Sequence, residues 1–319
     1  MRGLRIAVIG AGHMGRRHAQ KVAALSEQGG GLRLAGVADV DRARASRLAL
    51  ELGTRAVREP AELFAGADAA IVAVPTVAHF EVVRAALEAG LDVLVEKPVA
   101  ATLREGEELL QLAERRRRVL QVGHVEWFNA AIPALLEHLR APRFAEAQRF
   151  GRFSERVSDV DVVRDLMIHD LDILQRLLRE EPAHVEAIGV PVVSDTIDVA
   201  SARIEFPSGC VASLTASRVA EDPVRRLRLF QSEGFFTIDF LAQSASLTRR
   251  VGRGAGLPER LETEELKVDP EDALLSQLRH FAEAVRTRRP GAASGAEALG
   301  ALRTALRVIE AMPPAAKRS

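Results

Sequence analysis

Short apolar runs and amphipathic segments alternate through the first 123 residues. The apolar runs have the length of buried strands and occupy residues 5–9, 32–38, 55–57, 68–75, 91–95 and 119–122. The segments at residues 42–52, 79–89 and 102–118 have the apolar spacing of helices. Strands that alternate with helices in this way form a doubly wound parallel sheet. We therefore predict an α/β domain over residues 1–123.

The pattern changes after residue 143, where strands follow one another with turn signals between them. The predicted strands cover residues 144–153, 185–190, 199–206, 210–217, 226–231 and 235–240. One helix over 163–178 interrupts this series, and helices over 271–286 and 296–312 close the chain. We predict that residues 124–319 form an α+β domain on a large open, mostly antiparallel sheet. We expect its last helix to pack back on the first domain and residues 250–259 to form a loop.

Composition and charge narrow the possible functions. The 319 residues suffice for two domains, and the formal net charge of zero gives no overall attraction to nucleic acid or membrane. Cys210, the single cysteine, excludes an internal disulfide and fits a reducing cytoplasm, and no apolar run approaches the ~20 residues of a membrane span. The four arginines at residues 115–118 are interpreted as a solvated helix end rather than a nucleic-acid patch.

The first apolar run ends in a glycine-rich turn. Gly10, Gly12 and Gly15 form G-x-G-x-x-G between a strand and a helix, with His13 and Met14 inside the motif. This context is typical of dinucleotide binding, because the glycines permit a tight turn, close approach of a pyrophosphate and close helix packing. The free N–H groups and the dipole at the start of the helix favour the same anion.

Asp39 follows the second predicted strand. An acidic residue about 20 positions beyond the glycines is placed to bind a ribose 2′-hydroxyl, and its charge disfavours a 2′-phosphate. The sequence therefore predicts NAD rather than NADP. The alternative interpretation makes Asp39 the N-cap of the helix that begins near Arg42.

Polar residues follow two further strands, at the edge of the sheet where α/β proteins bind ligands. Val74, Pro75, Thr76 and His79 follow one strand, and we expect them to contact the cofactor. Glu96 and Lys97 follow the next. Burial beside a cofactor can lower the pKa of a lysine and make it a useful base. The alternative is a surface lysine at a strand end.

The helix over 163–178 carries Asp165, His169 and Asp172. The spacings i, i+4 and i+7 put them on one face of an α-helix, where carboxylates can orient a histidine and raise its basicity. A solvated polar row is the alternative, and without a second His/Cys cluster we predict no metal. The remaining histidines are assigned structural roles: His18, His124, His138, His184 and His280.

Taken together, these motifs resemble the Gfo/Idh/MocA oxidoreductase family. The resemblance covers both domains and rests on four motifs: the glycine loop with His18-Ala19, Pro75-Thr76-x-x-His79, Glu96-Lys97-Pro98 and Asp165-x-x-x-His169-x-x-Asp172. It implies a Rossmann domain, a nicotinamide cofactor and oxidation of a sugar or cyclitol hydroxyl, or the reverse. It also implies a homodimer or homotetramer built by the open sheet. Lys97 would transfer the proton, and His169 with Asp165 would position the substrate.

Residues 122–129 and 158–172 are similar to a branch of the family that includes UDP-N-acetylglucosamine 3-dehydrogenases. The enzymes of that branch provide the substrate of a pyridoxal-phosphate aminotransferase on the route to lipid A. The resemblance implies substrate contacts for Trp127, Asn129 and Asp172, although Trp127 replaces the arginine usual before Phe-Asn. Two alternatives remain: an oxidoreductase of a free sugar, cyclitol or other carbonyl, and a non-catalytic NAD-binding regulator.

Overall fold

The computed structural model describes residues 3–153, 160–251, 260–289 and 293–313. Backbone contacts divide the chain into two units. The first unit contains residues 1–125 and 272–299, and the second contains residues 126–271 and 300–319. The chain therefore enters the second unit after Val125, returns at Asp272 and leaves again at Gly300, within one helix.

The first unit is built on a six-stranded sheet in the order β3-β2-β1-β4-β5-β6, parallel throughout. Its strands are β1 (Leu4–Ile9), β2 (Leu32–Ala38), β3 (Ala56–Val57), β4 (Ala69–Val72), β5 (Asp92–Val95) and β6 (Leu120–Val122). Its helices are α1 (His13–Glu27), α2 (Arg42–Glu51), α3 (Ala61–Phe64), α4 (His79–Glu88), α5 (Leu103–Arg116) and α8 (Ala273–Thr287). The predicted doubly wound parallel sheet is confirmed. The chain reverses its direction of travel across the sheet between β1 and β4, which is the ligand-binding position in such sheets.

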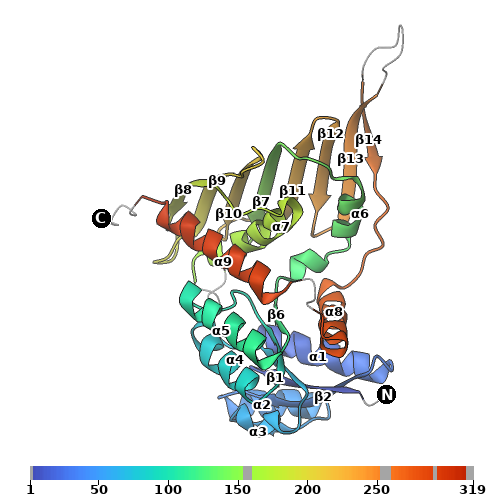
Figure 1. Ribbon diagram of the computed structural model, residues 1–319, viewed down its shortest axis with the longest axis vertical. Helices are drawn as coiled ribbons and strands as arrows, with labels where there is room; N and C mark the ends of the chain where they lie inside the picture. Colours follow the sequence, from blue (N-terminus) through green and yellow to red (C-terminus); the bar gives the residue numbers. More distant parts are fainter. Residues whose placement is uncertain (1–2, 154–159, 252–259, 290–292, 314–319) are drawn as a thin grey trace. The chain divides into compact units, whose positions relative to one another are not determined.

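α8 completes the core of this unit although it comes late in the chain. Leu278, Phe281 and Val285 of α8 are buried in one cluster with Val22 of α1 and Ile71 of β4. α8 and α1 lie side by side (Figure 1). A fully buried aliphatic or aromatic side chain contributes roughly 1.5–3 kcal/mol to stability, so this helix is an integral part of the unit.

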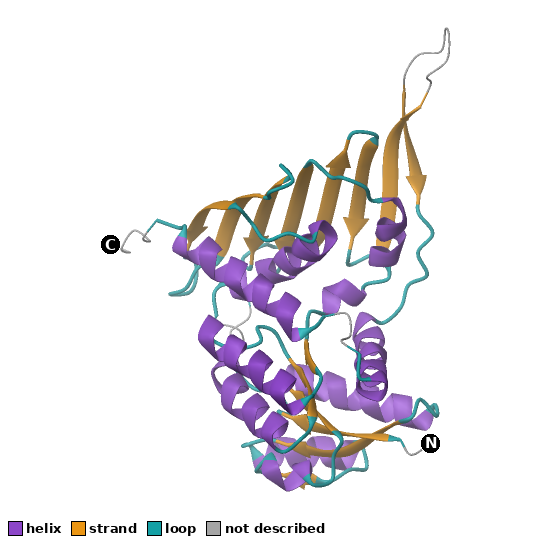
Figure 2. Cartoon of the chain, viewed as in Figure 1, coloured by secondary structure: helices purple, strands orange, loops and turns teal. Residues whose placement is uncertain are grey.

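The second unit is built on an eight-stranded sheet in the order β14-β13-β12-β11-β7-β10-β9-β8. The strands are β7 (Phe144–Phe150), β8 (His184–Val190), β9 (Val199–Glu205), β10 (Val211–Ser217), β11 (Val224–Gln231), β12 (Gly234–Asp239), β13 (Ser244–Val251) and β14 (Arg260–Glu265). The pair β7–β10 is parallel and the other pairs are antiparallel. The predicted mostly antiparallel sheet is confirmed (Figure 2).

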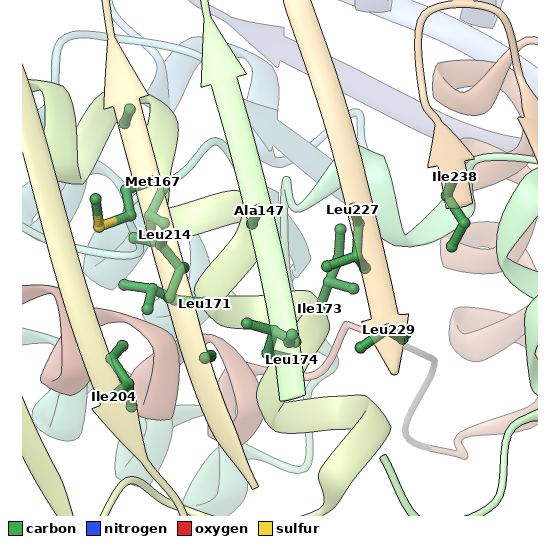
Figure 3. Packing of buried hydrophobic residues seen from close by; sticks show 14 of the residues in the cluster. Ala147, Met167, Leu171, Ile173, Leu174, Ile204, Leu214, Leu227, Leu229 and Ile238 are labelled. Atoms are coloured by element: carbon green, nitrogen blue, oxygen red, sulfur yellow. The ribbon is translucent and has the colours of Figure 1, made fainter. Parts of the chain in front are cut away.

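Helices cover one face of this sheet. They are α6 (Ala131–His138), α7 (Ile168–Leu178) and the second part of α9 (Gly295–Glu310). Leu171, Ile173 and Leu174 of α7 pack against inward side chains that include Ala147 and Leu227 (Figure 3). The side chains of alternate strand residues therefore form one continuous core beneath the helices.

Three elements of the second unit differ from the sequence-based expectation. The predicted helix 163–178 begins as a π-helical turn, Val163–Met167, and becomes α-helical only at α7. β13 and β14 were not predicted. β14 is exposed at every position and mostly charged, so it lacks the apolar alternation of a strand. Arg250 and Val251 of the predicted loop belong to β13, while 252–259 lie outside the described residues.

No helix in the described part of the chain is long and apolar enough to cross a membrane.

Candidate active site

Close packing accounts for two of the three motif glycines. Gly10 has a φ of +95°, and a Cβ there would lie 2.3 Å from the carbonyl oxygen of Ala73. A Cβ on Gly15 would lie 1.8 Å from the carbonyl oxygen of Gly10. Both positions therefore exclude any side chain, because real contacts do not become this short. The turn between β1 and α1 is held tightly against the end of β4.

Gly12 is different, because a Cβ there would meet no described atom within 4 Å. Gly12 is also the N-cap of α1, and no side chain caps this helix start in the described residues. Open space therefore lies beside Gly12 at the start of α1, where no side chain provides a cap. This combination fits the pyrophosphate of a dinucleotide, whose charge is favoured at a helix N-terminus.

Asp39 joins the end of β2 to the glycine turn. Its buried carboxylate accepts hydrogen bonds from the N–H of Ala11 at 2.7 Å and from the N–H of Asp41 at 2.8 Å. Asp41, and not Asp39, is the N-cap of α2, where it accepts from the N–H of Arg44. The capping alternative for Asp39 is therefore wrong, and its ribose contact stays a prediction.

Glu96 stands at the carboxyl end of β5 in contact with a buried histidine of α1. His18 Nε2 lies 2.6 Å from Glu96 Oε1. Burial alone would raise the pKa of Glu96, but the hydrogen bond from His18 and the charges of His18 and Lys97 outweigh it and hold the pKa below its ordinary range. An ionised carboxylate thus lies next to Lys97. Assigning His18 a purely structural role missed this contact, because its partner is 78 positions away in the sequence.

His79 connects the two loops that follow β4 and β5. Its Nδ1 lies 2.8 Å from the carbonyl oxygen of Pro98, and its Nε2 lies 3.0 Å from that of Val74. Burial lowers the pKa of His79, which favours a neutral ring that donates to one of these oxygens at a time. His79 therefore fixes the backbone on both sides of the site, next to the half-buried Lys97. A contact of His79 with cofactor stays a prediction, as it does for Pro75 and Thr76.

In the second unit, the three residues of the predicted polar row, Asp165, His169 and Asp172, lie in two different environments. Asp165 in the π-helical turn and His169 in the first turn of α7 are both partly exposed. Asp172 is buried and forms a 2.8 Å ion pair with Arg176, whose guanidinium lies 5.1 Å from the ring centroid of Trp127. Asp165 and His169 are therefore the accessible members of the row, whereas Asp172 supports Arg176 and Trp127.

Asn129 is buried and bonded to the protein's own backbone. Its Nδ2 donates to the carbonyl oxygen of Phe240 at 2.9 Å, and its Oδ1 accepts from the N–H of Ala131 at 3.1 Å. The side chain thus fixes the start of α6. Substrate contacts for Asn129, Trp127 and Asp172 stay predictions.

A buried ion cluster beside His169 was not predicted from the sequence. Arg149 of β7 makes a bidentate contact with Asp170, at 3.0 and 2.8 Å, and a third bond of 2.9 Å with Glu126. Arg225 donates to the same Glu126 oxygen at 2.8 Å. Burial raises the pKa of Asp170 against the opposing effect of Arg149. Because Asp170 directly follows His169, this cluster holds the first turn of α7, which carries His169.

Comparisons with known proteins agree with this arrangement. The model of the oxidoreductase family with an NAD-binding Rossmann fold matches residues 4–124, and the GFO/IDH/MocA C-terminal domain model matches residues 137–237. A UDP-N-acetylglucosamine 3-dehydrogenase from Acidithiobacillus ferrooxidans is 38% identical over 307 residues, covering 96% of each chain. A scyllo-inositol 2-dehydrogenase (NAD(+)) from Bacillus subtilis is 27% identical over 303 residues, covering 89% of this chain and 86% of its own.

Solved structures with the same fold are found as well. The structure of UDP-N-acetylglucosamine 3-dehydrogenase GnnA from Acidithiobacillus ferrooxidans matches with a TM-score of 0.90 at 38% identity, covering 98% of both chains. A levoglucosan dehydrogenase in complex with NADH and levoglucosan shares the fold, with a TM-score of 0.85 at 17% identity and 97% coverage of both chains.

Proposed function

Because the chain belongs to the Gfo/Idh/MocA oxidoreductase family and carries its NAD-binding Rossmann domain, we propose that it oxidises the C3 hydroxyl of UDP-N-acetylglucosamine. The observation that carries this proposal is the similarity to the Acidithiobacillus ferrooxidans enzyme along nearly the whole of both chains. The motif residues Lys97, Asp165 and His169 support a catalytic enzyme rather than a regulator that only binds NAD.

The first unit offers residues that fit NAD. The turn from Gly10 to Gly15, with the backbone of His13 and Met14, would hold the pyrophosphate at the uncapped start of α1. Asp39 would accept a hydrogen bond from the adenosine ribose. The segments at Val74–Thr76 and Glu96–Lys97 would adjoin the nicotinamide, as they follow neighbouring strands of the sheet. Bound NAD⁺ supplies the hydride acceptor.

The proposed roles of the side chains divide into proton transfer and orientation. Lys97 Nζ, in its neutral form, accepts the proton of the sugar hydroxyl. Glu96 is held ionised by His18 and places a negative charge beside that lysine. His169 and Asp165 hydrogen-bond the sugar and orient the reacting hydroxyl, which lowers the entropic part of the barrier.

A coupled assay tests the proposed substrate. Purified protein receives NAD⁺ and UDP-N-acetylglucosamine, with a glutamate-dependent aminotransferase to remove the ketone, and the absorbance of reduced nicotinamide is followed. We expect a signal that requires both NAD⁺ and the nucleotide sugar. Turnover with myo- or scyllo-inositol and none with the nucleotide sugar would favour the second candidate, a cyclitol dehydrogenase, which the Bacillus subtilis relative suggests. NAD binding without turnover on any sugar would favour the regulator.

We further propose that the ketone product passes to a pyridoxal-phosphate aminotransferase on the route to lipid A, in the cytoplasm. A buried, unpaired Cys210 fits a reducing compartment. Accumulation of the 3-amino sugar only when both enzymes are present would support this coupling. A product that the aminotransferase does not accept would refute it.

Changing Asp39 to Asn should raise the affinity for NADPH relative to NADH by about ten-fold, because it removes a charge that repels a 2′-phosphate. Fluorescence titration of both dinucleotides measures the ratio. Asp41→Asn is the matched control, because it keeps a capping residue at the start of α2 and leaves Asp39 in place. An unchanged ratio in the Asp39 variant would limit Asp39 to fixing the glycine turn.

We propose that the uncovered face of the large sheet joins copies of the chain. Phe230 on this face is partly exposed and packs against Phe144 and Phe235, with ring centroids 5.7 and 5.2 Å apart, and Arg228 lies over two of the rings. Light scattering should give a mass two or four times that of one chain. Phe230→Asp should reduce it to the monomer mass, while Leu50→Asp, at an exposed position of α2, should not. A monomeric native protein would contradict the proposal.

A further inference from the structure

The first unit contains a cavity away from the carboxyl ends of the strands. Its volume is about 800 Å³. It is lined by residues at the end of α5, the start of β6, the end of α8 and the start of α9. Arg118 lies two residues before the start of β6, whereas Glu96 directly follows the neighbouring parallel strand β5. The cavity therefore lies at the opposite edge of the sheet from the NAD-binding turn.

Five arginines line this cavity. Arg116, Arg117 and Arg118 come from the end of α5, and Arg288 and Arg289 come from the end of α8. One glutamate, Glu114, lines it as well. The chain as a whole has no net charge, so this is a local concentration of positive charge. Like charges that share one cavity repel each other, and a bound anion relieves that repulsion.

Solvation of a helix end accounts for only part of this arrangement. It explains the consecutive arginines at the end of α5. It does not explain why Arg288 and Arg289, at the end of a helix far away in the sequence, line the same cavity. Arg288 is moreover fixed, because it donates to both oxygens of the buried Asp92 at 2.6 and 2.8 Å. Arg117 and Arg288 occupy left-handed C-cap positions, with φ values of +53° and +56°. The C-terminal ends of α5 and α8 are thus held so that arginines from both helices line the same cavity.

A buried amide gives independent evidence of a ligand. Gln121 of β6 lines the cavity and is 1% exposed. Neither its Oε1 nor its Nε2 has a hydrogen-bond partner within the described ranges. Buried polar side chains in native proteins are nearly always hydrogen-bonded, so this amide offers a donor and an acceptor to a molecule bound in the cavity. One donor and one acceptor together match the edge of a nucleobase.

The other lining groups complete the chemical description. Leu110, Ala113 and Leu120 contribute apolar surface next to Gln121. Guanidinium groups bind phosphate oxygens by paired hydrogen bonds and stack on planar rings. The volume lies within the range of pockets that hold molecules of nucleotide size. We propose that this cavity binds a nucleoside polyphosphate, with the base at Gln121 and the apolar wall and the phosphates on the arginines.

Calorimetric titration tests the site on the full-length protein saturated with NADH, so that the dinucleotide turn is occupied. GTP is the probe, because it contains neither the adenosine of NAD nor the uridine of the proposed substrate. We expect one GTP per chain and weaker binding of tripolyphosphate, which lacks a base. Arg117→Gln with Arg289→Gln should weaken GTP binding by about ten-fold or more, and Arg115→Gln should leave it unchanged. Arg115 is the matched control, since it is exposed on the same helix and does not line the cavity.

Gln121→Leu separates recognition of the base from recognition of phosphate. It should weaken GTP binding and leave tripolyphosphate binding unchanged, with NADH affinity as the check that the unit is folded. The proposal would be overturned by GTP binding that the double arginine variant does not weaken, or by no binding. Equal binding of GTP and tripolyphosphate would overturn the nucleotide assignment in favour of an inorganic polyanion. Affinity that rises with the length of an oligonucleotide would replace it by a nucleic-acid surface.

Discussion

Changing Lys97 to alanine should lower turnover of UDP-N-acetylglucosamine by about 10²-fold or more, while NAD binding persists. The expected loss is that of a general acid–base group. Lys97 follows the buried strand β5 and is half-buried beside Glu96, whose pKa is held low. Steady-state turnover with saturating NAD⁺ and substrate measures the chemical role. Titration with NADH measures whether the cofactor site survives.

Two further variants make this result specific. Lys267→Ala removes an exposed lysine whose amino group lies 3.8 Å from Asp269 in the second unit, and it should leave turnover unchanged. His18→Asn removes the imidazole beside Glu96, so it should alter the pH profile of turnover rather than abolish it. Near-normal turnover of Lys97→Ala would refute the assignment of Lys97 as the proton acceptor.

Changing Arg149 to methionine should lower the free energy of unfolding by about 3–5 kcal/mol. The variant keeps much of the side-chain volume but leaves the carboxylates of Asp170 and Glu126 buried without their main partner. Burial already raises the pKa of Asp170, so loss of Arg149 should drive it further toward protonation. Urea unfolding followed by circular dichroism measures the change.

Arg225→Met is the matched control for this prediction. Arg225 binds the same Glu126 oxygen, but its side chain is 43% exposed, so its contribution is expected to be about 0–1 kcal/mol. Equal and small losses in both variants would show that the buried cluster does not stabilise the unit. We also expect Arg149→Met to reduce turnover, because Asp170 anchors the helix that carries His169.

Elements with local patterns could be predicted from the sequence. The parallel sheet and the glycine turn follow from apolar runs and from backbone positions that only glycine can occupy. The order of the motifs along the strands placed Glu96 and Lys97 at a carboxyl end, as observed. These features need no knowledge of distant contacts.

Features that depend on distant partners could not be predicted. His18 and Glu96 belong to motifs 78 positions apart, and only the fold shows that the two side chains are in contact. Arg149 did carry a signal, because Ala145, Ala147 and Arg149 share the buried face of β7. An arginine in register with two buried alanines indicates a buried ion pair, but nothing in the sequence singled out its partner Asp170, 21 positions away and outside the predicted row of Asp165, His169 and Asp172.

The late position of α8 has a consequence for biosynthesis. The sheet of the first unit is complete once residue 122 has been made, but the side chains that cover its face beside α1 belong to residues 273–287. At ribosomal rates of about 5–20 residues per second, the intervening chain takes on the order of ten seconds to synthesise. During that time the nascent unit exposes the apolar surface that Phe281 later covers, so this surface is where chaperones would act on the growing chain.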